Sequence, residues 1–239
     1  MIVLAHRGYS GNYPENTLLA FEKAMEFGAD GVELDVHLTK DGKMVICHDE
    51  SLYRTYGKRA NIKETIFEEL RNYDSMGQKM PTLEEVFQIL PASSIINIEL
   101  KTNVVSYPFL VEKVLELVNK NHPERVWISS FNHSTLVHVR ELDKNVKLGM
   151  LFDNEHAKNL KASMELSLKI GIFSYNVPIE AGSFEEFERF IDFAKGNGIK
   201  IVFWNSNTIT DMNFAQKHDA YAIITNEVER ATNFFKGKM

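Results

Sequence analysis

The chain has 239 residues, of which 44% are hydrophobic and 25% charged, and its net charge is −6. This is the balance of a globular protein with one well-filled core, and the negative charge argues against a nucleic-acid backbone as the main partner. The single cysteine, Cys47, excludes an intrachain disulfide. No apolar run reaches the roughly 20 residues that span a bilayer, and none resembles a secretory signal. We therefore expect no stable membrane insertion and a cytoplasmic location.

Short apolar runs rich in β-branched residues recur along the chain and predict strands that are covered on both faces. They are residues 2–5, 31–36, 95–100, 126–131, 147–152, 172–177, 200–204 and 222–225. Patterns with helical spacing lie between them, at residues 15–27, 82–90, 107–121, 134–142, 157–168, 184–195, 209–217 and 228–235. Eight strands alternating with eight helices predict an α/β protein, a single (β/α)₈ barrel of the TIM type formed by residues 1–239 as one domain.

One apolar run, residues 44–48, is left over from this alternation. An Asp41-Gly42 pair joins it to the second strand, and Asp-Gly between two strand-like runs predicts a hairpin. We therefore expect an extra hairpin strand at the barrel rim, with Asp35 opposite His48 if the turn has two residues. Residues 50–81 would then form an irregular excursion.

Polar side chains occur where the predicted strands end, which is where barrel enzymes place their chemistry. Glu33 and Asp35 end the second strand, and Glu99 ends the third. The strand period of two points Glu33 and Asp35 to the same side, where buried carboxylates repel each other unless a cation lies between them. Three carboxylates offer hard oxygen ligands that suit Mg²⁺, Ca²⁺ or Mn²⁺. The alternative is a structural network in which Glu33 and Asp35 pair with Lys or Arg side chains.

Two histidines are expected beside these carboxylates. His6 follows the first strand, and the hairpin delivers His48. Histidines titrate near neutrality, so a pair flanking a metal can act as general acid and general base. The remaining histidines are interpreted as structural residues; they are His37, His122, His133, His138, His156 and His218.

From residue 4 to about 225, the chain resembles the glycerophosphodiester phosphodiesterase family, because five motifs occur in the order that is typical of that family. The motifs are Ala5-His6-Arg7-Gly8, Pro14-Glu15-Asn16-Thr17, Glu33-Leu34-Asp35-Val36, His48-Asp49 and Glu99-Leu100-Lys101. A tryptophan, Trp204, also ends a late strand, as the resemblance leads us to expect.

The resemblance implies a metal-dependent hydrolysis of small glycerophosphodiesters to glycerol 3-phosphate and an alcohol. It implies that Glu33, Asp35 and Glu99 bind one divalent cation, Mg²⁺ or Ca²⁺, and that the two histidines named above are the catalytic acid and base. Arg7 and Lys101 would hold phosphate oxygens.

Three further residues are expected near this site. The resemblance implies that Trp204 lines the substrate pocket. Phe131 would supply an apolar wall or else pack into the core. Glu15, directly after an active-site loop, would orient Arg7 or His6, or else cap the first helix.

Two stretches depart from the family, one at residues 219–222 and one after the last strand. The stretch after the last strand is usually Thr-Asp-x-Pro, whereas this chain has Thr225-Asn226-Glu227-Val228. We expect this departure to lie away from the metal and the histidines.

Two other functions stay open at this point. One is a related barrel phosphodiesterase that acts on a phospholipid head group. The other is a catalytically silent barrel that only binds phosphorylated ligands. The sequence does not indicate an oligomeric state.

Overall fold

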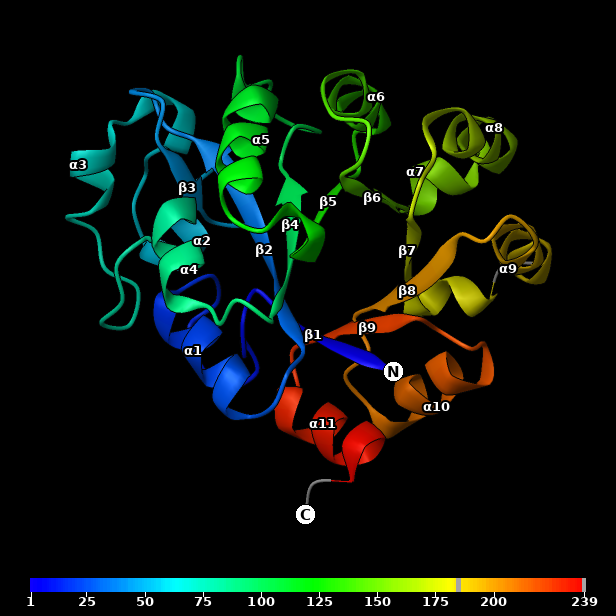
Figure 1. The fold of residues 1–239 in the computed structure, drawn as a ribbon. Coiled ribbons are helices and arrows are strands. Elements are labelled where there is room, and N and C mark those ends of the chain that lie inside the picture. The colour runs from blue at the N-terminus through cyan, green and yellow to red at the C-terminus, as the bar shows by residue number, and fades with distance from the viewer. Residues whose placement is uncertain (184–185, 238–239) are drawn as a thin grey trace.

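Eight parallel strands close into a barrel in the computed structural model, which describes residues 1–183 and 186–237 (Figure 1). The ring is closed because β1 pairs with both β2 and β9. Its strands, in order around the ring, are β1 (Ile2–His6), β2 (Gly31–Leu38), β4 (Ile95–Leu100), β5 (Val126–Ser130), β6 (Lys147–Leu151), β7 (Ser174–Pro178), β8 (Lys200–Trp204) and β9 (Ala222–Thr225). The predicted barrel and its eight strands are confirmed, with small shifts at the strand ends.

Helices surround the ring on its outside (Figure 1). They are α1 (Leu18–Glu26), α4 (Leu83–Ile89), α5 (Leu110–Lys120), α6 (His133–Leu142), α7 (Asn154–Ala157), α8 (Leu160–Ile170), α9 (Phe187–Gly196), α10 (Ile209–Lys217) and α11 (Val228–Lys236). All eight predicted helices are present, although the predicted start of one at Phe184 lies outside the described residues. Within the described chain, no helix is both long and apolar enough to cross a bilayer.

The first helix begins later than predicted. Thr17 is its N-cap, and the Thr17 hydroxyl accepts a hydrogen bond from the backbone N–H of Ala20. A capping threonine satisfies one of the free N–H groups of the first turn. Glu15 is therefore not the cap, and its carboxylate is available for other contacts.

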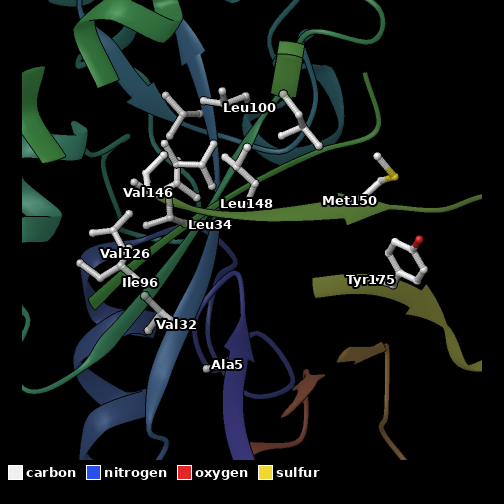
Figure 2. Close-up of a cluster of buried hydrophobic side chains, with 14 of the residues drawn as sticks. Ala5, Val32, Leu34, Ile96, Leu100, Val126, Val146, Leu148, Met150 and Tyr175 are labelled. Carbon is white, nitrogen blue, oxygen red and sulfur yellow. The ribbon is translucent and has the colours of Figure 1, made fainter. Parts of the chain in front are cut away.

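The two faces of the strands have different surroundings. Outward side chains pack against the helices in the main core, and Figure 2 shows part of it, with Val32 and Leu34 of β2 near Ile96 of β4 and Val126 of β5. A second, separate apolar cluster is formed at alternate positions of the same ring by Leu4, Trp127, Val202, Ala222 and Ile224. Two residues further along several of these strands, the inward position is polar. The inner face of the barrel thus changes from apolar to polar toward the carboxyl ends.

The extra strand β3 (Met44–Ile46) pairs antiparallel with the end of β2. The predicted register is wrong by one residue, because Val36 pairs with Ile46, which places Cys47 rather than His48 opposite Asp35. The cause is the turn. The Thr39 N–H donates to the Lys43 carbonyl around a three-residue loop, and Gly42 adopts φ +78°, as three-residue hairpin loops with a bulge require.

The excursion after β3 packs on a small core of its own. It contains α2 (Tyr53–Tyr56), η1 (Ile62–Glu64) and α3 (Phe67–Leu70). Leu52, Ile62 and Met80 are fully buried there together with Cys47 of the hairpin. This core fixes α2 beside the carboxyl end of the barrel.

Gly31 begins β2 at a point of close backbone approach, where an added Cβ would collide with the carbonyl oxygen of Ile95. We expect Gly31→Ala to lower the free energy of unfolding by about 1–3 kcal/mol, because overpacking forces the backbone to shift. Urea unfolding measures this change. Gly196→Ala, at the end of α9 with no atom within 4 Å of the added Cβ, is the control and should leave stability unchanged or slightly raised. Equal stability of the two variants would contradict this account of the β2–β4 contact.

Candidate active site

Three carboxylates converge inside the carboxyl end of the barrel. Glu33 and Asp35 extend from β2 and Glu99 from β4, and one oxygen of each lies within 4.8 Å of the others. The neighbouring strands pair in a register that places Asp35 beside Glu99. All three side chains are buried. The predicted convergence of these carboxylates is confirmed.

Their electrostatics reflect crowding in a desolvated space. Burial raises the pKa of Glu33 well above its usual range, and the charges of Asp35 and Glu99 raise it further. Burial also raises the pKa of Glu99 to about 7, against the opposing effect of Lys101. Burial acts on Asp35 in the same sense, but the Lys101 and Arg7 cations outweigh it and lower the pKa of Asp35.

Two cations balance part of this charge. The Nζ atom of Lys101 lies 2.8 Å from Glu99 Oε1 and 3.4 Å from Asp35 Oδ1. Arg7 Nε lies 3.5 Å from Asp35 Oδ2. For Asp35, these contacts agree with the alternative in which the carboxylates pair with Lys or Arg side chains in a structural network.

Glu33 does not fit that network. Among the described residues, no Lys or Arg side chain forms an ion pair with Glu33, and its nearest basic side-chain atom in ion-pair range is His6 Nε2 at 3.9 Å. Its Oε2 atom instead accepts a hydrogen bond of 3.1 Å from the backbone N–H of Arg7. Three buried carboxylates that share two cations fit a hard divalent cation such as Mg²⁺ or Ca²⁺.

Arg7 is held by Glu15, the residue whose role the sequence left open between Arg7, His6 and a helix cap. The Arg7 Nη1 group donates to Glu15 Oε1 at 3.0 Å. The turn that presents Arg7 requires a glycine next to it, because Gly8 adopts φ +78° and an added Cβ would lie 2.6 Å from the backbone of Ala20. Of the three contacts considered for Glu15, the structure therefore shows the one with Arg7.

His6 is oriented by a residue that the sequence analysis missed. Its Nδ1 atom lies 2.6 Å from Asn226 Oδ1, and Ser10 Oγ also contacts that oxygen. The expectation that the departure at Asn226 lies away from the histidines is wrong. Barrel closure pairs Ala5 with Thr225, so the next residue of each chain segment, His6 at the end of β1 and Asn226 after β9, lies beside the other. Burial, reinforced by Arg7, lowers the pKa of His6 to about 4.

His48 is oriented by a chain of charged groups. Its Nδ1 atom lies 2.6 Å from Asp49 Oδ1, and Asp49 Oδ2 accepts from Arg54 Nε at 2.6 Å. Arg54 also donates to both carboxylate oxygens of Glu15, at 2.7 and 2.9 Å. The contacts form one path from His48 to Arg7. Asp49 belongs to the His48-Asp49 motif, but the sequence did not indicate its contact with His48. The position of Arg54 in the sequence did not indicate that its side chain reaches the site.

A pocket of about 80 Å³ opens over the carboxylates, with His6 and His48 among its walls. Phe131 and Trp204 also line it, with ring centroids 5.8 Å apart in an edge-to-face arrangement. The structure therefore places Phe131 at the pocket wall. Several buried polar atoms of the lining have no hydrogen-bond partner; they are Asn97 Oδ1, Ser129 Oγ, Trp204 Nε1 and Asn205 Oδ1. Such atoms are costly unless a ligand or water satisfies them.

The other histidines lie outside the carboxylate cluster. His37 is buried, with Nδ1 2.8 Å from the Tyr107 hydroxyl and Nε2 3.2 Å from the carbonyl oxygen of His48. It therefore supports the backbone of a site residue. His156 contacts the carbonyl oxygen of Phe131 from behind the pocket wall. The remaining four make contacts elsewhere; they are His122, His133, His138 and His218.

Comparison with known proteins agrees with this geometry. Residues 6–230 match the family model described as the glycerophosphoryl diester phosphodiesterase family. A glycerophosphodiester phosphodiesterase of Caldanaerobacter subterraneus subsp. tengcongensis is 36% identical over 245 residues, which cover 98% of each chain. The crystal structure of a glycerophosphodiester phosphodiesterase from Thermotoga maritima is 36% identical, with a TM-score of 0.86 over 100% of this chain and 98% of that chain. A human lysophospholipase D is 35% identical over 139 residues, which cover 52% of this chain and 43% of that protein.

The family model covers nearly the whole chain, and the Caldanaerobacter and Thermotoga proteins match it along almost their full length, one in sequence and the other in sequence and structure. Both comparisons name the same activity, and the residues that carry the resemblance lie around one pocket. The chain belongs to the glycerophosphoryl diester phosphodiesterase family and is an enzyme that hydrolyses phosphodiesters.

Proposed function

We propose that this enzyme hydrolyses small glycerophosphodiesters to glycerol 3-phosphate and an alcohol, using one divalent cation and two histidines. The observation that carries the proposal is the incomplete charge balance at Glu33, beside His6 and close to the cations Arg7 and Lys101. Family membership supports the reaction, and the carboxylate cluster supports the need for a cation.

Glu33, Asp35 and Glu99 would hold the cation. When bound, it would supply Lewis-acid neutralisation of the phosphate oxygens. Arg7 and Lys101 lie at the same edge of the barrel, where their charges would hold the phosphodiester and stabilise the negative charge that develops in the transition state.

The two histidines would move protons. The Nδ1 atoms of His6 and His48 are occupied by Asn226 and Asp49, so the Nε2 atom of each ring is left for the substrate. One ring would take the proton of the attacking hydroxyl, and the other would give a proton to the leaving alkoxide. Asn226 and Asp49 would fix the ring orientations and tautomers for these transfers.

The glycerol part of the substrate would occupy the pocket over the carboxylates, which we call the first pocket. The unpartnered atoms of Asn97, Ser129, Trp204 and Asn205 include hydrogen-bond donors and acceptors, which match hydroxyl groups. The apolar faces of Phe131 and Trp204 would contact the carbon chain. This combination of ring faces and unsatisfied polar atoms supports a polyol next to the phosphate.

A second candidate is a phosphodiesterase that acts on a lysophospholipid head group, which the human relative named lysophospholipase D favours. Comparing turnover of lysophosphatidylcholine with that of glycerophosphocholine distinguishes the two. A preference for glycerophosphocholine supports the small-substrate proposal, and a preference for the lipid overturns it. The silent-barrel alternative has lost its support, because the chain belongs to an enzyme family and no expected metal, histidine or phosphate-binding position is missing.

Removing divalent ions should abolish glycerophosphocholine hydrolysis, and adding Mg²⁺ or Ca²⁺ should restore it, because Glu33, Asp35 and Glu99 would otherwise repel one another. The measurement is release of glycerol 3-phosphate before and after EDTA treatment. Full activity of the metal-free enzyme would refute the proposed cofactor.

The same cation should change stability in a pH-dependent way. The folded-state pKa of Glu99 is raised from 4.5 to about 7, so the folded metal-free protein binds more protons than the unfolded chain. The contribution of Glu99 to the free energy of unfolding should therefore fall as the pH rises through that window. The lowered pKa of Asp35 changes the stability only at pH values below the ordinary pKa of an aspartate, so it does not affect the comparison between pH 5 and pH 8. Added Mg²⁺ or Ca²⁺ should raise Tm more at pH 8 than at pH 5, and an equal shift at both would contradict this assignment.

Replacing either His6 or His48 with alanine should lower kcat by about 10²–10⁴-fold, the usual size of a general acid–base contribution. Circular dichroism should show an intact fold, because both rings lie at the rim of the barrel. The double variant should lose little more than the worse single variant, because residues that act as a unit are not additive. The control is His138→Ala on α6, where the exposed ring contacts Glu112 and Glu141. Near-normal kcat in His6→Ala or His48→Ala would refute the acid–base pair.

A further inference from the structure

A second pocket lies next to the first, and His48 lines both. It has a volume of about 120 Å³, and its walls include His48, Glu50, Lys101, Asn103, Val104 and Val105. Lys101 and His48 are residues that the proposed reaction places against the phosphate. A group attached to that phosphate can therefore enter this pocket directly.

A phosphodiester carries two alcohol substituents, and the enzyme offers a pocket for each. The first pocket has aromatic walls and unsatisfied polar atoms that match glycerol. The second pocket is then the place for the other alcohol, which leaves in the reaction. This assignment rests on the proposed function.

One carboxylate gives the second pocket its charge. Asp49 is engaged by His48 and Arg54, and the Lys101 ammonium is engaged by Glu99 and Asp35. Glu50, in contrast, forms no side-chain hydrogen bond or ion pair with any residue of the described chain, although it is only half exposed. Its charge acts within the pocket region, because burial and then Glu50 raise the pKa of the Tyr107 hydroxyl. Glu50 is therefore the uncommitted charge of this pocket.

The other walls suit a small organic cation rather than a metal ion. Val104 is 70% exposed at the pocket mouth, and Val105 beside it is half-buried. Two valines beside one uncommitted carboxylate cannot complete an oxygen coordination sphere, but they can contact methyl and methylene groups around an ammonium.

We propose that this pocket binds the leaving alcohol and that Glu50 selects an alcohol that carries an ammonium group, such as choline or ethanolamine, over a neutral one. The carboxylate attracts the ammonium while the two valines contact its carbon atoms. Partial exposure keeps the discrimination modest, since water screens the interaction.

The test is the ratio of kcat/KM for glycerophosphocholine to kcat/KM for glycerophosphoglycerol, whose leaving alcohol is neutral. The wild-type ratio should exceed one, and Glu50→Gln should lower that ratio by about five- to tenfold, the effect of one partly screened charge pair. Glu50→Lys should lower it further. Glu64→Gln is the matched control, because Glu64 is exposed on the same excursion and lines a different pocket, so the ratio should not change.

An unchanged ratio in Glu50→Gln would overturn the inference, as would an equal fall in Glu64→Gln, which would point to the general field of the protein. These outcomes differ from failure of the proposed function, in which the wild-type enzyme hydrolyses neither diester in the presence of a divalent cation. That result would remove the inference as well.

Discussion

The arrangement of the site depends on three buried carboxylates that share two cations. Glu33, Asp35 and Glu99 are forced together because β2 and β4 are neighbours and their inward positions stand at the same height in the barrel. Lys101 and Arg7 compensate Asp35 and Glu99, while Glu33 has no such partner among the described residues. A buried charge without a partner destabilises a folded protein. Such charges are therefore typical of functional sites, where a ligand compensates them. A bound cation, as proposed above, would balance this charge, and the phosphate of a diester substrate would then meet a positive centre.

The two histidines beside the carboxylates are held by residues from outside the carboxylate cluster. His6 takes its orientation from Asn226, because ring closure places the residue after the last strand beside the residue that ends the first. His48 depends on the excursion after β3, where Arg54 joins Asp49 to the glutamate that also holds Arg7. The excursion after β3 therefore has a clear physical role. Its small core fixes Arg54, which connects the contacts around His48 with those around Arg7.

Much of the site follows from strand periodicity and the rule that strand ends carry the chemistry in α/β barrels. These features were sufficient for the barrel and for the convergence of its carboxylates. The hairpin register was not predictable from Asp41-Gly42 alone, because the pair is compatible with loops of two and of three residues. Asn226 was misjudged because its partner is 220 residues away in sequence and only barrel closure brings them together. Arg54 lies in an irregular segment of the sequence, where no strand or helix periodicity predicts the direction of its side chain.

The most direct test of this account is a titration with Mn²⁺ followed by electron paramagnetic resonance, which detects the bound ion without any turnover. We expect one tight Mn²⁺ site per chain in the wild-type enzyme. Glu33→Gln and Asp35→Asn should each weaken it strongly, whereas Glu68→Gln, at an exposed position of α3, should not. Unchanged Mn²⁺ binding in both cluster variants would show that the surplus of buried negative charge has another purpose.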